Sequence, residues 1–132
     1  MRRATTVVSL ALCLIGCGAV SPFPPEVFEL AHSREPSTAC SLGWWTEGQL
    51  VVDGNHGTSI LVEGGDFGSK GATLQVLWWP EFTGRRVGNE VEILDPDGKV
   101  VATTGRRYRI EAAFPMVEDG AVVVCGSEVT PL

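Results

Sequence analysis

The side chains of this sequence best suited to contact a ligand are four tryptophans in two neighbouring pairs, Trp44-Trp45 and Trp78-Trp79. In a β-strand, neighbouring side chains point to opposite faces. If Val76 and Trp78 face the core, Trp79 faces outward. An exposed indole can stack on a sugar ring or on an apolar side chain of a partner. The competing interpretation is that Trp79 covers one end of the folded domain, which Trp44 and Trp45 also plug.

Two arginine clusters form a second candidate site, because guanidinium groups bind carboxylates and phosphates through paired hydrogen bonds. Alternation places Arg107 and Arg109 on the outer face of a strand, with Tyr108 between them facing inward. Together with Trp79 they are the predicted contact residues. The competing interpretation is cross-strand ion pairing of the arginines. The clusters are Arg85-Arg86 and Arg106, Arg107 and Arg109, and the available glutamates are Glu90, Glu92 and Glu111.

Metal binding and catalysis lack the residues that they need. The loop "DGNHG" (residues 53–57) and the turn "DPDG" (95–98) each hold fewer ligands than zinc or calcium requires. The sequence contains no G-x-S-x-G, no H-E-x-x-H, no phosphate-binding loop and no dinucleotide-binding glycine motif. We therefore expect no metal, no cofactor and no enzymatic activity. The alternative is a cell-wall or carbohydrate-active enzyme that uses surface carboxylates.

The start of the chain has the order of an export signal. Arg2 and Arg3 precede an uncharged apolar run, residues 4–15, which is too short to span a bilayer. The run leads into Leu14-Ile15-Gly16-Cys17, which resembles the lipobox of bacterial lipoproteins. The resemblance implies cleavage before Cys17, acyl chains on that cysteine, and a mature protein anchored at the extracytoplasmic face of the cell membrane. The alternative is a secretory signal cut at another small residue, near Ala19.

The charge of the mature chain limits its partners. Removal of residues 1–16 takes away Arg2 and Arg3 and leaves 8 basic residues against 16 acidic ones, a net charge of −8. Such a chain is unsuited to bind nucleic acid or an anionic lipid surface by charge. We therefore expect contact with the membrane through the lipid on Cys17, and an envelope protein or a glycan as partner.

The remaining cysteines predict a disulfide. Cys13 lies in the signal and Cys17 in the lipobox, which leaves Cys40 and Cys125 as one pair in an exported domain. The bridge would close a loop of about 85 residues and contribute about 4–5 kcal/mol by restricting the unfolded chain. Two free thiols are the alternative.

The composition divides the mature chain into a tether and one domain. Residues 17–39 contain four prolines and no sustained hydrophobic period, which predicts an extended tether. Residues 40–132 contain seven short apolar runs separated by Gly, Asp and Pro, which predicts an all-β fold of mainly antiparallel strands. A small barrel buries one compact core and leaves no free edges. We therefore expect an antiparallel β-barrel similar in architecture to the OB fold, with an immunoglobulin-like β-sandwich as the alternative.

Overall fold

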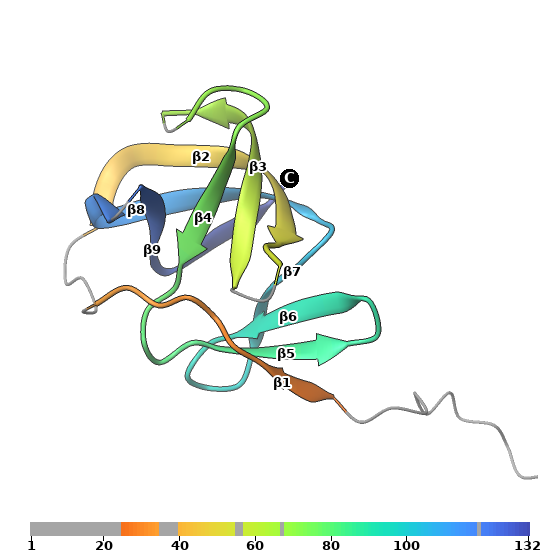
Figure 1. Cartoon of the computed structure of the whole chain (residues 1–132). Helices are drawn as coiled ribbons and strands as arrows, with labels where there is room; N and C mark the ends of the chain where they lie inside the picture. The colour runs from red at the N-terminus through yellow and green to blue at the C-terminus, as the bar shows by residue number, and fades with distance from the viewer. Residues whose placement is uncertain (1–24, 35–39, 55–56, 67, 119) are drawn as a thin grey trace, which may run out of the picture.

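The computed structural model describes residues 25–34, 40–54, 57–66, 68–118 and 120–132. Every regular element in these residues is a strand (Figure 1). The strands are β1 (Glu26–Phe28), β2 (Cys40–Val52), β3 (Thr58–Gly65), β4 (Thr73–Leu77), β5 (Thr83–Val87), β6 (Glu90–Leu94), β7 (Val100–Thr103), β8 (Arg107–Glu118) and β9 (Ala121–Pro131). The predicted all-β class is confirmed.

Five strands close into a barrel in the order β2-β3-β4-β9-β8, with β8 paired to β2. The predicted small OB-like barrel is therefore confirmed, and the sandwich alternative is wrong. One detail differs from the antiparallel expectation, because β4 and β9 pair in parallel, Val76 with Val122 and Leu77 with Val123. A parallel pair needs a long connection between its strands, and here β5 to β8 lie between them in the chain.

A second sheet, β1-β5-β6-β7, lies beneath one end of the barrel (Figure 1). Seven of the nine strands coincide with the apolar runs in the sequence. The other two, β1 and β5, were not predicted. The sequence of β5, "TGRRV", has no apolar alternation, and this strand is held by backbone pairing with β6 over Thr83↔Leu94 to Val87↔Glu90.

The N-terminal boundary of the domain differs from the prediction that residues 17–39 form a tether. Residues 26–28 pair with β5, and the side chains of Phe28 and Leu30 are buried. The next residues run beside Trp78, whose backbone N–H donates to the carbonyl of Ala31 at 3.0 Å and whose carbonyl accepts from Ser33 at 2.8 Å. The folded unit therefore includes β1. Residues 35–39 lie outside the described residues.

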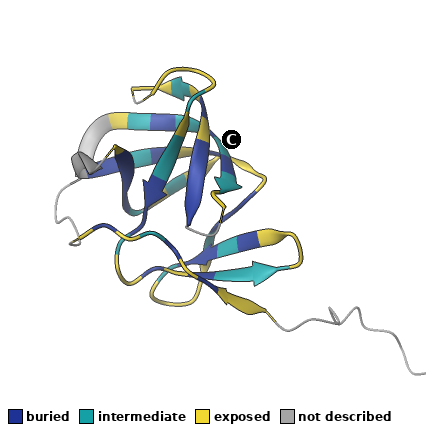
Figure 2. Ribbon diagram, viewed as in Figure 1, coloured by how far each residue is buried: buried dark blue, intermediate teal, exposed yellow. Residues whose placement is uncertain are grey.

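One continuous core joins the barrel to the second sheet. Buried and partly exposed residues alternate along β2 (Figure 2), and its buried Leu50 belongs to the same core cluster as Trp78. The indole N–H of Trp78 donates to Thr58 Oγ1 at 2.9 Å. At the junction with the sheet, the hydroxyl of Tyr108 accepts from the backbone N–H of Thr103 at 2.8 Å. The bond between Thr103 and Tyr108 therefore ties β7 of the second sheet to β8 of the barrel.

Candidate functional site

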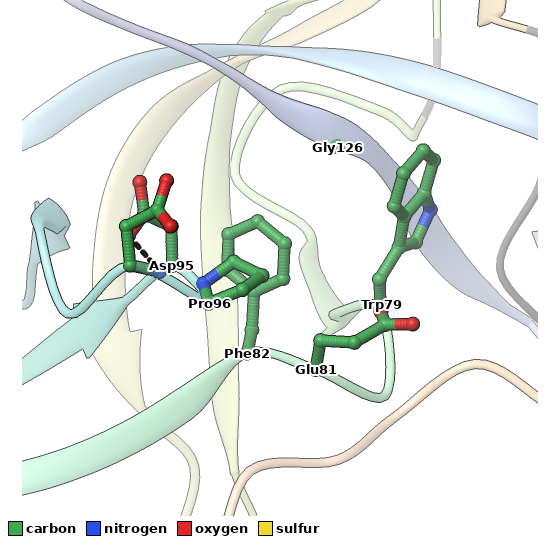
Figure 3. Close-up of a pocket in the computed structure, with 7 residues that line it drawn as sticks. Trp79, Glu81, Phe82, Asp95, Pro96 and Gly126 are labelled. Carbon is green, nitrogen blue, oxygen red and sulfur yellow. Dashed lines mark hydrogen bonds between the residues drawn. The ribbon is translucent and has the colours of Figure 1, made fainter.

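A pocket of about 270 Å³ lies where the loop after β4 meets the turn between β6 and β7 (Figure 3). Three separate segments form it, since β9 supplies Gly126 as well. The fold therefore creates this pocket, and no local motif does. Its lining residues are Trp79, Glu81, Phe82, Asp95, Pro96, Asp97 and Gly126.

The walls of the pocket are apolar and rest on the core. The ring of Trp79 lies over Gly126 of β9. A Cβ placed on Gly126 would be 3.5 Å from the Cζ3 and Cη2 atoms of Trp79. Gly126 has a φ of +52°, so it supplies both a flat surface and a backbone conformation that favours glycine. Phe82 is 3% exposed, and its ring centroid lies 6.0 Å from that of Trp78. The aromatic side chains of the pocket, Trp79 and Phe82, thus pack on the buried core, which fixes their positions.

The polar groups of the pocket are carboxylates. Glu81 and Asp97 are exposed, and Asp95 is half-buried. Asp95 Oδ1 accepts the backbone N–H groups of Asp97 at 3.0 Å and of Lys99 at 2.9 Å, which fixes the turn. Glu81 comes from the loop after β4, so the carboxylates approach the pocket from two segments. No lysine, arginine or histidine belongs to the lining within the described residues.

Trp79 is neither fully outward nor part of the buried core. Its side chain is partly buried and packs against the main cluster. Its Nε1 is buried without a hydrogen-bond partner and lies on the ring edge turned away from Pro96 (Figure 3). The sequence singled out Trp79, but it gave the aspartates of "DPDG" only a turn role and did not identify Glu81. The signal that was available is the aromatic and acidic run "WWPEF", at residues 78–82.

Arg107 and Arg109 lie on the outer face of β8, as alternation predicts, and both are paired. The guanidinium of Arg107 donates to the carboxylate of Glu63, with Nε at 2.8 Å from Oε2. Arg109 donates to Glu47 at 2.6 Å, and its guanidinium carbon lies 4.2 Å from the ring centroid of Trp45. The cross-strand alternative therefore describes these arginines, although Glu63 and Glu47 are not the partners that were expected.

The third arginine contact follows the same pattern. Arg85 Nε lies 3.2 Å from Glu92 Oε1, a pair that was expected across β5 and β6. Within the described contacts, neither Arg107 nor Arg109 meets Trp79. The three residues therefore do not form the joint contact site that the sequence suggested.

The Arg107–Glu63 pair shifts the titration of both groups. The hydrogen bond from Arg107 lowers the pKa of Glu63 below its ordinary value, and the charge of Arg107 acts in the same direction. The same bond raises the pKa of Arg107. Both side chains remain open to solvent.

The predicted cysteine and loop sites are only partly described. Cys17 and the side chain of Cys40 lie outside the described residues. The backbone of Cys40 pairs with Ala113, and Ala113 packs in the same small cluster as Cys125. Cys125 is fully buried and is not a free thiol.

The loop "DGNHG" contains Asp53 and His56. His56 lies outside the described residues, whereas Asp53 Oδ2 accepts from Ser59 Oγ at 2.9 Å. Over the described ranges, no three residues of His, Cys, Asp and Glu are grouped so that they can hold a metal ion. The same ranges contain no helix of the length and apolarity needed to cross a membrane.

Comparisons with protein-family models, with curated proteins and with solved structures found no match to this chain.

Proposed function

We propose that this protein is a lipid-anchored, extracytoplasmic binding module of the cell envelope, without enzymatic activity of its own. The observation that carries the binding role is the pocket beside Trp79, which combines a fixed aromatic wall with exposed carboxylates. Such a combination of apolar surface and a few convergent polar groups is typical of a ligand site. The barrel and the second sheet together supply the frame, and three separate segments of the chain supply the lining.

The anchoring role rests on the N-terminal sequence. A charged head, an apolar run and Leu14-Ile15-Gly16-Cys17 support lipidation of Cys17. Two or more acyl chains on one protein bind a membrane stably, whereas a single chain binds marginally. We expect several chains on Cys17 for that reason.

A disulfide between Cys40 and Cys125 is part of the same proposal. The pairing of Cys40 with Ala113 brings the first residue of β2 beside the strand that packs on Cys125, which supports the bridge. It would join both ends of the barrel sequence, and disulfides of this kind form in the oxidising space outside the cytoplasm.

A cell-wall or carbohydrate-active enzyme is the second candidate, because Glu81 and Asp97 reach one pocket from different segments. Glycosidases use two carboxylates on either side of the bond that they cleave. An enzyme of this kind would release soluble sugars from purified cell walls, and Glu81→Gln or Asp97→Asn would abolish the release. We expect no release by the unaltered protein.

Cell fractionation tests the proposed location. We expect the unaltered protein in the membrane fraction and its domain accessible to protease added to spheroplasts. Cys17→Ser removes the acylated thiol, so this variant should stay as an uncleaved precursor or leave the membrane. Recovery of the unaltered protein in the soluble cytoplasmic fraction would contradict the proposal.

A further inference from the structure

We propose that the pocket beside Trp79 binds a cationic group on an apolar stem, the side chain of a lysine or arginine that a partner protein presents. The inference rests on the proposed binding function and names the chemistry of its ligand. It follows from the size of the pocket, from its hydrogen-bonding groups and from its charge.

The size of the pocket fits one side chain. Its volume of about 270 Å³ is slightly below the range of about 300–1,000 Å³ that is usual for sites of small-molecule ligands. The faces of Trp79, Phe82 and Pro96 provide apolar surface along its walls (Figure 3). The methylene stem of a lysine or arginine can pack on such a surface while its charged end stays near water.

The carboxylates of the pocket accept hydrogen bonds and do not donate them. Ionised Glu81, Asp95 and Asp97 are acceptors only. The one donor among the lining side chains, Trp79 Nε1, is buried and faces away from Pro96, so a ligand in the pocket does not reach it. Ammonium and guanidinium groups are donors only. A site whose polar groups are all acceptors therefore matches an ammonium or guanidinium group. It matches a sugar less well, because sugar hydroxyls also accept hydrogen bonds from donors.

The charge of the pocket has no counter-charge within the described lining. Glu81, Asp95 and Asp97 contribute three carboxylates. The bond from Lys99 to Asp95 comes from the backbone N–H of Lys99 and not from its ammonium group. A mature chain with a net charge of −8 adds a long-range attraction for cations. A cation near the face of Trp79 would gain from the aromatic ring as well. Anionic ligands are disfavoured on the same grounds.

Binding of matched peptides tests this inference. The probes are a blocked pentapeptide with one central lysine between glycines and the same peptide with norleucine, which keeps the apolar stem and removes the charge. Titrations of the purified full mature protein at low salt would be followed by NMR, through the amide signals of Asp97 and Gly126. We expect both signals to move with the lysine peptide and little change with the norleucine peptide.

Charge variants locate the binding. Glu81→Gln combined with Asp97→Asn should weaken binding of the lysine peptide about tenfold, as expected for the loss of charge-assisted hydrogen bonds. Glu90→Gln is the matched control, because Glu90 is the exposed first residue of β6 and does not line the pocket. These surface changes leave the core intact, and circular dichroism would verify the fold.

Three results would overturn the inference. They are equal binding of the two peptides, equal weakening by Glu90→Gln, and binding of methyl glucoside or N-acetylglucosamine in the pocket without binding of the lysine peptide. The last result would keep the binding function and replace the ligand class. Failure of membrane anchoring would affect the proposed location alone, since the peptide titration does not depend on it.

Discussion

Trp78 and Trp79 are neighbours in the chain but have different roles: Trp78 is part of the core, and Trp79 lines the pocket. Trp78 is fully buried and its indole N–H is bonded to Thr58. Trp79 keeps a partly exposed ring in the pocket, and its buried N–H has no partner. A buried donor without a partner costs about 1–3 kcal/mol. The two tryptophans should therefore respond differently to the same substitution.

Trp78→Phe should lower the free energy of unfolding by about 2 kcal/mol or more, because it leaves a cavity and removes the bond to Thr58. Trp79→Phe should change that free energy by less than about 1 kcal/mol, since the loss of ring contacts is offset by removal of an unpaired donor. Urea denaturation of both variants measures the difference. Equal destabilisation by the two changes would contradict the assigned roles.

The Arg107–Glu63 pair predicts a dependence of stability on pH. Its hydrogen bond lowers the pKa of Glu63 in the folded state, so the contribution is present above the pKa of an unfolded glutamate and is lost as the pH falls through the folded value. Glu63→Gln should therefore be slightly less stable than the unaltered protein at neutral pH. The difference should vanish at a pH well below the ordinary glutamate pKa.

Chemical denaturation at the two pH values measures this effect. It should be small, as is usual for exposed pairs, and smaller again at high salt. Glu90→Gln is the control for loss of an exposed carboxylate without a described ion pair. A Glu63→Gln difference that persists unchanged in acid would show that the ion pair is not its cause.

Alternation predicts which face a residue occupies, and it placed Arg107, Tyr108 and Arg109 as the structure does. It does not predict the partner across the strands, because register depends on turns and bulges elsewhere. Glu47 lies opposite Arg109 in the register of β2 with β8, which shifts between Cys40 and Trp45. The pocket was not predictable for the same reason, since the parallel pairing of β4 with β9 brings Gly126 beside Trp79.

At the level of the elements, apolar runs predicted the strands that bury side chains and missed those held by backbone pairing. β1 has three residues in a proline-rich region, and only Phe28 of them is buried. Arg86 of β5 covers the ring of Phe28, with its guanidinium carbon 5.3 Å from the ring centroid. Such a strand is stabilised by its neighbour, so its own sequence carries little signal.

The pairing of β2 with β3 predicts that Gly48 and Gly64 differ sharply in how well they tolerate substitution by alanine. A Cβ on Gly48 would lie 1.9 Å from the backbone oxygen of Leu61, whereas the nearest atom to one on Gly64 is Glu47 Oε2 at 3.9 Å. Gly48→Ala must separate the two strands, so we expect it to cost about 3 kcal/mol or to prevent folding.

Gly64→Ala is the matched control in the neighbouring strand. It should change the free energy of unfolding by less than about 1 kcal/mol, because an alanine there meets no backbone. Thermal and urea denaturation would measure both variants. A well-folded Gly48→Ala protein of unaltered stability would contradict the close approach of the strands.

For the whole molecule, the position of β1 shortens the proposed tether. If Cys17 is the anchor, eight residues lie between it and Glu26, and the nine residue-to-residue steps span at most about 30 Å. A tether that continued to Cys40 would span about 80 Å by the same measure. The second sheet should therefore stay near the bilayer, with the loop between β3 and β4 farther away (Figure 1).

Energy transfer to acceptor lipids tests this orientation in vesicles. A fluorophore on Val27→Cys, at a position 86% exposed, should transfer efficiently, and one on Lys70→Cys should transfer less. Insertion of about 15 Gly/Ser residues between Val20 and Ser21 should lengthen the tether and reduce transfer from position 27. Equal transfer from both positions, unaffected by the insertion, would contradict a short tether.

The intact mass of the mature protein is the most direct test of the account, because the proposed anchoring at Cys17 would fix both the location and the reach of the domain. Protein extracted from bacterial membranes should have the mass of a chain that starts at residue 17 with a diacylglycerol group, and Cys17→Ser should lack that modification. A mass that corresponds to an unmodified chain, or to cleavage near Ala19, would contradict the lipid anchor and place the protein among secreted ones.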